Sequence, residues 1–286
     1  MRMKNKRDQI LLVEKINSQG QGISRLEDGK VVFVDGVLPG EKVSCRIGIE
    51  KTNYALCELD KIIENHPRRI VPPCEWYGEC GGCQLQHCSY DLQLELKRQI
   101  LEDALYRIGQ IDRNFSVMPC IPSPLALEYR NKASFPLRGK NGVTIPGFYR
   151  KGSHDLVHIN NCVLIDRDLQ DLFRRMSELS ELMGPHGYDE KQHRGLFRHL
   201  ILRKALSSGE ILICLVVTHQ PGNKWEKRLT RFYESLSGKI PGIKGLVINV
   251  NPLRTNTILG SRTRLIAGDP LLKDKLGGFS LSYDST

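Results

Sequence analysis

The stretch PPCEWYGECGGC, residues 72–83, places Cys74, Cys80 and Cys83 in one loop with the spacing C-x5-C-x2-C. The loop is rich in glycine and begins with two prolines, so it offers the thiols almost nothing apolar to pack against. Thiolates this close need a metal ion or a cluster, and soft sulfur ligands indicate zinc or iron–sulfur. Structural zinc usually takes two short cysteine pairs, or one cysteine pair and one histidine pair. Three cysteines together, with Cys162 far downstream, favour an iron–sulfur cluster, and zinc is the alternative.

Two residues compete for the fourth ligand position. Cys88 follows Cys83 closely and lies beside His87, so a compact zinc knot would need no distant ligand. Cys162 would instead require the chain to return from a long insertion. Spacing alone does not decide between them. Four other cysteines lie in strand-like or apolar contexts, which is typical of buried small side chains: Cys45, Cys57, Cys120 and Cys214.

Composition indicates a soluble protein with an anionic partner. The chain has 286 residues, 40% of them hydrophobic and 26% charged, which suggests about two globular domains. Its net charge of +10 suits nucleic acid. The excess is uneven, because residues 125–152 carry six basic residues against one acid and residues 191–231 carry nine against two.

The sequence indicates a cytoplasmic protein. The apolar run Ile10–Val13 is too short for a signal peptide, and the longest run, Ile211–Val217, is far too short to span a membrane. Nine cysteines without an export signal indicate a reducing compartment, where metal ligation or free thiols outrank disulfides. We therefore expect a cytoplasmic location and no membrane partner.

Hydrophobic patterning predicts an α+β fold. Residues 8–66 contain short strand-like runs separated by turn signals, which predicts a small β-barrel. The amphipathic run Tyr90–Ile108 predicts a helix that Gly109 would end. Residues 125–265 alternate between strand-like and helix-like runs, which predicts a mainly antiparallel sheet with two helices. The predicted strands are Gln9–Lys15, Lys30–Val34, Lys42–Ile49, Tyr54–Ile63, Glu128–Leu137, Val143–Arg150, Asp155–Ile159, Leu196–Ala205, Glu210–Thr218 and Gly245–Val250, and the predicted helices are Asp166–Leu182 and Lys224–Ser235.

Basic residues interleaved with aromatic ones are the candidate RNA contacts. Arg130, Lys132, Arg138 and Arg150 alternate with tyrosines and phenylalanines, an arrangement that suits phosphate pairing and base stacking on single-stranded RNA. On the residues alone, a solvated basic strand face with its aromatics in the core is the more common arrangement. A second possible phosphate stripe comprises Arg194, Arg198, Arg203 and Lys204.

Four stretches resemble the bacterial RNA uracil-5 methyltransferases, and within them the 23S rRNA branch. Residues 71–87 resemble the [4Fe-4S] loop of that family, and YRNKA at 129–133 resembles its central-domain signature. GFYR at 147–150, leading to Asn161 and Cys162, resembles the segment that brings the fourth ligand. Residues 22–41 resemble a TRAM module, a small RNA-binding barrel.

The resemblance implies a set of cofactors and partners. It implies a [4Fe-4S] cluster held by Cys74, Cys80, Cys83 and Cys162. It implies RNA as the partner, 23S rRNA in particular, with the four basic residues as contacts and no DNA partner. The family transfers a methyl group from S-adenosylmethionine to carbon 5 of a uridine, using a cysteine nucleophile and a general base in a C-terminal Rossmann-like domain.

No catalytic or S-adenosylmethionine site is visible in this sequence. There is no G-x-G-x-x-G, and the residues after Ile266 are too few for another α/β domain. We therefore expect the RNA-binding, [4Fe-4S]-containing N-terminal portion of such an enzyme, truncated before the catalytic domain and inactive alone. The alternative is a stand-alone zinc- or cluster-stabilised RNA-binding protein without catalysis.

The resemblance also predicts the domain boundaries. Residues 1–68 would form a TRAM-like, OB-like barrel and residues 69–90 the cluster-binding loop. Residues 91–120 would be a helical segment that packs on the absent methyltransferase domain. Residues 121–268 would form the iron–sulfur-bearing central α+β domain, and residues 269–286 the start of the methyltransferase domain.

Overall fold

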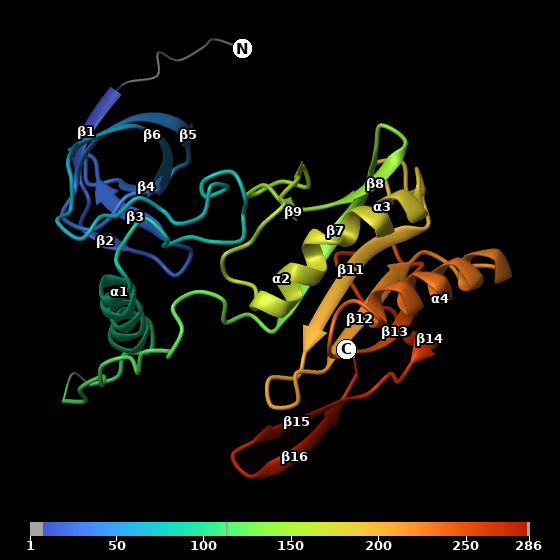
Figure 1. Cartoon of the computed structure of the whole chain (residues 1–286). Helices are drawn as coiled ribbons and strands as arrows, with labels where there is room; N and C mark the ends of the chain where they lie inside the picture. Colours follow the sequence, from blue (N-terminus) through green and yellow to red (C-terminus); the bar gives the residue numbers. More distant parts are fainter. Residues whose placement is uncertain (1–7, 113, 285–286) are drawn as a thin grey trace. The chain divides into compact units, whose positions relative to one another are not determined.

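The computed structural model describes residues 8–112 and 114–284, which divide between two compact units, Met1–Ala126 and Leu127–Thr286 (Figure 1). Both units contain strands and helices, so the predicted α+β class is confirmed. In the described part of the chain, no helix is both long enough and apolar enough to cross a membrane. The finer domain boundaries stay a prediction.

The first unit is built on a six-stranded barrel. Its strands are β1 (Asp8–Leu12), β2 (Lys15–Ile16), β3 (Gln21–Arg25), β4 (Val31–Asp35), β5 (Lys42–Glu50) and β6 (Tyr54–Glu64), in the order β1-β5-β6-β4-β3-β2. Only Val13 and Glu14 separate β1 from β2, yet β1 pairs with β5 and β2 pairs with β3. One continuous segment therefore forms both edges, and the sheet closes on itself.

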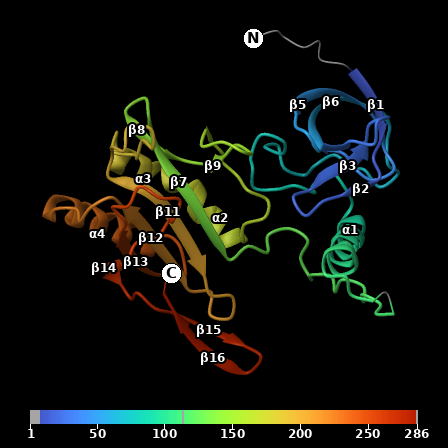
Figure 2. The ribbon, with the colours of Figure 1, turned by 180° about the vertical axis from the view of Figure 1, so that it is seen from behind.

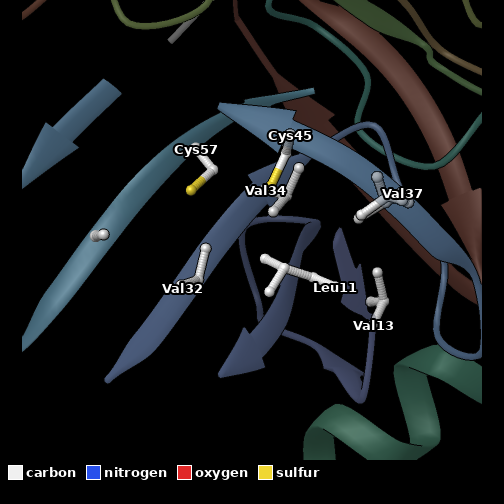
Figure 3. Close-up of a cluster of buried hydrophobic side chains, with 9 residues drawn as sticks. Leu11, Val13, Val32, Val34, Val37, Cys45 and Cys57 are labelled. Atoms are coloured by element: carbon white, nitrogen blue, oxygen red, sulfur yellow. The ribbon is translucent and has the colours of Figure 1, made fainter. Parts of the chain in front are cut away.

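Side chains that alternate along the strands fill the barrel (Figure 3). Val32 and Val34 of β4 point inward and are almost fully buried, which follows from the two-residue period of a strand. Cys45 and Cys57 join the same core, as predicted for small apolar side chains. The full buried set is Leu11, Val13, Val32, Val34, Val37, Val43, Cys45, Ala55 and Cys57.

Helix α1 (Tyr90–Asp103) follows the cysteine loop in the first unit. The Ser89 hydroxyl accepts a hydrogen bond from the Leu92 backbone N–H and caps the helix. Leu92 and Leu96 pack with Ile16 and Leu38, so one face of the helix is buried. The predicted helix reached Ile108, but its last five residues, Ala104–Ile108, form a π-helical turn.

The second unit is a six-stranded sheet with helices. Its order is β14-β13-β12-β11-β7-β8, and only β12 and β13 run parallel, so the sheet is mainly antiparallel. The strands are β7 (Lys132–Lys140), β8 (Val143–Pro146), β11 (Phe197–Lys204), β12 (Ile211–Val217), β13 (Ile243–Val250) and β14 (Arg262–Gly268). The helices are α2 (Arg167–Arg174), α3 (Met176–Met183) and α4 (Asn223–Ser237).

The two faces of this sheet are covered differently. On one face, Phe135 of β7 stacks on Phe173 of α2 with ring centroids 4.2 Å apart. The opposite face carries a buried cluster that includes Ile201, Val247 and Leu272, and the partly buried Ile258, Leu259 and Tyr283 pack against it. Figure 2 shows the ribbon from behind. Two small hairpins complete the unit: β9 (Phe148–Tyr149) with β10 (Leu156–Val157), and β15 (Leu272–Leu276) with β16 (Phe279–Tyr283).

Candidate nucleic-acid interface and cysteine loop

A buried ion pair fastens the cysteine loop to the barrel. The Glu41 carboxylate is fully buried and accepts hydrogen bonds from Arg69 Nε at 2.6 Å and Nη2 at 2.7 Å. It also accepts the backbone N–H groups of Leu38 at 2.8 Å and His66 at 3.1 Å. Burial opposes the charged form, but these hydrogen bonds lower the pKa of Glu41 below its ordinary value. Glu41 therefore stays ionised and holds the start of the loop on the barrel.

The cysteine loop presents N–H donors to its own sulfurs. Cys74, Cys80 and Cys83 are each partly buried. The Gly82 N–H donates to Cys80 Sγ at 3.4 Å, and Gln86 Nε2 donates to Cys83 Sγ at 3.0 Å. Hydrogen bonds to sulfur stabilise metal-bound thiolates and tune clusters. This donor set fits sulfur ligands of a metal ion or a cluster.

The structure gives the predicted [4Fe-4S] cluster no further support. Within residues 8–112 and 114–284, no group of three or more His, Cys, Asp or Glu side chains is arranged to hold a metal ion. Cys74, Cys80 and Cys83 belong to the first unit, and Cys162 is buried in the second. The ligand set therefore stays a prediction.

The rival ligands Cys88 and His87 both have structural roles. Cys88 is fully buried beside Leu92, its thiol donates to the Leu85 carbonyl at 3.2 Å, and burial raises its pKa to about 11. His87 Nδ1 lies 2.5 Å from the Tyr77 hydroxyl, and its Nε2 lies 3.4 Å from the Val37 carbonyl. Burial lowers the pKa of His87, so the ring is neutral at pH 7. Both side chains are therefore engaged by other parts of the first unit.

Arg138 lines a cavity of about 770 Å³ beside the end of β7. Its guanidinium donates to the Tyr188 carbonyl at 2.9 Å and pairs with Glu190 at 3.1 Å. Burial opposes ionisation of Glu190, but the Tyr149 hydroxyl and Arg138 lower its pKa. Arg138 is thus partly neutralised in the cavity wall. The basic residues of the lining are Arg138, Lys140, His154, Lys191 and Arg194.

The other predicted RNA contacts do not gather around that cavity. Lys132 begins β7 and is exposed, so it lies about 20 Å along the strand from Arg138. Arg150 is exposed in the turn that precedes β10, and Arg130 is partly buried just before β7. The role of these residues stays a prediction.

The predicted second phosphate stripe is wrong at Arg198, and two of its other members have partners within the protein. Arg198 is only 5% exposed, so it cannot face an RNA surface. Lys204 pairs with Asp166 at 2.8 Å and with Asp168 at 2.5 Å, and the guanidinium of Arg203 lies 4.3 Å from the ring centre of Tyr283. Their sequence spacing on one strand gave no sign of these partners. Arg194 alone is exposed.

Comparison with known proteins identifies one domain and a group of relatives. The TRAM domain family matches residues 5–59, which confirms the predicted module. A protein of Halalkalibacterium halodurans named as an uncharacterized RNA methyltransferase is 35% identical over 282 residues, 98% of this chain and 60% of the relative. A protein of Synechocystis with the same description is 39% identical over 276 residues, 95% of this chain and 58% of the relative. The chain thus spans about 60% of the length of these relatives.

A solved structure has a similar fold. The tRNA (uracil-54, C5)-methyltransferase of Pyrococcus abyssi, in complex with S-adenosyl-L-homocysteine, superposes with a TM-score of 0.67 at 20% identity. The match covers 96% of this chain and 59% of that one. At this identity the likeness shows the fold alone.

These matches correct the expected function. The expected function, a non-catalytic portion of such an enzyme, is contradicted, because proteins named RNA methyltransferase match 95–98% of this chain. The alternative of a stand-alone RNA-binding protein without catalysis is overturned with it. What stands is a TRAM-containing chain with similarity to RNA methyltransferases along its length.

Proposed function

We propose that this chain serves in the S-adenosylmethionine-dependent methylation of RNA. The observation that carries the proposal is the similarity to RNA methyltransferases over 95–98% of the chain, joined to a TRAM match at residues 5–59. The net charge of +10 supports a polyanionic substrate. Carbon 5 of a uridine is the proposed target, since the similar fold from Pyrococcus abyssi is named for that position. Ribosomal RNA, 23S in particular, is the proposed substrate among RNAs.

The proposal gives the described residues the task of holding RNA. Methylation of a base in a folded RNA requires that base to leave its stack, which is easiest in unpaired loops. The barrel of the first unit would bind RNA phosphates, and so would the basic residues Lys132 and Arg138 of the second unit. S-adenosylmethionine would supply the methyl group, and we assign no residue of this chain to it.

RNA binding should depend steeply on salt. The full chain should bind an RNA stem–loop with unpaired uridines, and each phosphate contact should add about 0.7–0.9 to the slope of log affinity against log salt. Replacing Arg130 and Lys132 with alanine should lower that slope by about 1.4–1.8 if both contact phosphate. Filter binding at several salt concentrations measures it. Replacing the exposed Lys227 and Arg231 of α4 is the charge-matched control. An RNA affinity that does not change with salt concentration would contradict the proposal.

We also propose that Cys74, Cys80 and Cys83 hold an iron–sulfur cluster, with zinc as the alternative. The spacing and the two N–H donors to sulfur support it. Protein purified without oxygen should be brown and contain about four irons and four sulfides per chain. Stoichiometric zinc without visible absorption would show that the cluster assignment is wrong.

Alanine at Cys162, the fourth ligand predicted from sequence, should release the iron. Alanine at Cys88 should retain it, because the Cys88 thiol is occupied in the core. The reverse pattern in iron content would make Cys88 the ligand instead.

A further inference from the structure

The segment from Asn251 to Ser261 connects β13 to β14 and is largely exposed (the 251–261 loop). Buried side chains form hydrogen bonds with its backbone. Its outer residues include Leu253, which is 58% exposed, and Arg254. Gly260 returns the chain so closely to β13 that a Cβ there would lie 2.0 Å from the Val250 carbonyl oxygen. The loop is therefore folded tightly onto the end of the sheet.

Two fully buried asparagines fix the backbone of this loop. Asn249 accepts the Gly260 N–H at 2.7 Å and donates to the Gly260 carbonyl at 2.9 Å. Asn251 donates to the carbonyls of Thr257 at 2.7 Å and Ile258 at 2.9 Å, and accepts the Leu253 N–H at 3.0 Å. The amide groups of both side chains are thus used to hold the loop.

A buried arginine holds the outer half of the loop. Arg198 Nη1 donates to the carbonyls of Asn251 at 2.8 Å and Leu253 at 2.7 Å, and Nη2 donates to Thr255 at 3.4 Å. Its guanidinium also lies 4.9 Å from the ring centre of Tyr188. No carboxylate in the described part of the chain forms an ion pair with it.

The free-energy cost of burying the Arg198 guanidinium must be offset by what it stabilises. Arginine is rarely buried without an acidic partner, because removing a charge from water is energetically costly. Here the guanidinium and two buried amides all order one exposed loop. A loop fixed before binding does not lose conformational freedom when a partner arrives, so rigid display increases affinity. The structure therefore has the features of a preformed binding loop.

The charges around the loop indicate an anionic partner. Residues 235–268 contain five basic residues, Lys239, Lys244, Arg254, Arg262 and Arg264, and no acid. Arg254 and Arg262 are exposed, and neither has an ion pair or a side-chain hydrogen bond within the described residues. The loop also lies at the carboxyl ends of the parallel strands β12 and β13.

We propose that the 251–261 loop is an RNA-binding element, in which Arg254 of the loop and the adjoining Arg262 of β14 contact backbone phosphates and Arg198 positions the loop. The proposal rests on RNA as the substrate and assigns a part of its recognition. Leu253 would pack against an unpaired base next to those phosphates.

The test is RNA binding by the full chain carrying Arg254→Ala and Arg262→Ala. At about 0.1 M salt each lost phosphate contact should weaken binding about fivefold, so the double variant should bind about 25-fold more weakly, with a slope lower by about 1.4. The matched control is Arg167→Ala with Arg175→Ala, which removes the exposed arginine that begins α2 and the one that follows it, and should leave binding near that of the wild type. Binding by the double variant that equals the control overturns the proposal, and a loop that serves a protein partner would give this result.

Arg198→Lys tests the positioning role, because it keeps the charge and removes the planar fork. Hydrogen exchange should accelerate at the Leu253 amide, and RNA affinity should fall about fivefold, roughly the cost of ordering one residue. The salt slope should stay unchanged, since no phosphate contact is lost. Unchanged affinity with faster exchange would exclude the positioning role. If the wild-type chain binds no RNA, the proposed function itself fails, whereas equal binding by wild type and Arg254/Arg262 variant overturns this inference alone.

Discussion

Replacing Arg69 with methionine is expected to destabilise the first unit by about 3–5 kcal/mol, because it leaves the Glu41 carboxylate buried without its partner. Each unit contains one of the two tryptophans, Trp76 in the first and Trp225 in the second. In a Trp225→Phe background, tryptophan fluorescence therefore reports the unfolding of the first unit alone when urea is added. The neighbouring Arg68 is the control: its pair with Glu95 is exposed, so Arg68→Met should change stability little. Equal effects of the two variants would contradict the anchoring role of Arg69.

The same ion pair should make the first unit sensitive to acid. The folded-state pKa of Glu41 is lowered, so its contribution to stability is complete above its ordinary value of 4.5 and is lost as pH falls through the lowered value. Arg69→Met should therefore lower the free energy of unfolding by less at low pH, where the Glu41 carboxyl can be protonated. Adding Glu41→Gln to Arg69→Met should recover part of the lost stability at pH 7, since it removes the unpaired charge.

In the barrel, a strand with inward apolar residues could be predicted, and one with inward polar and small residues could not. The alternation of Val32 and Val34 indicated β4 correctly. β3 was missed because its inward residues are Gly22 and Ser24. A Cβ at Gly22 would lie 2.3 Å from a methyl group of Val37, and the Ser24 hydroxyl donates to the Leu12 carbonyl at 2.7 Å. Only the closed barrel makes those two residues suitable for the interior.

The binding residues show the same limit. Arg198 looked like a surface phosphate ligand in the sequence, yet its donors bind carbonyls some 53–57 positions away. Burial of Asn249 and Asn251 likewise depends on a loop that folds back over them. The expectation of a non-catalytic portion rested on motifs that the sequence lacks. Similarity to RNA methyltransferases along 95–98% of the chain contradicted it.

Loss of the protein should remove a methylated uridine from cellular RNA completely. Carbon 5 of uridine is a poor nucleophile, and enzymes typically accelerate their reactions by factors of a million or more over the uncatalysed rate. If the proposed function holds, no residual methylation at the target position is expected once the protein is gone. Re-expression of the full-length protein should restore it.

The most direct test of RNA methylation is mass spectrometry of nucleosides and RNA fragments from source cells with and without the gene. Ribosomal and transfer RNA are analysed separately, which also identifies the substrate. We predict the loss of 5-methyluridine from at least one position, and its return on re-expression. An unchanged set of methylated nucleosides in both fractions would contradict the account.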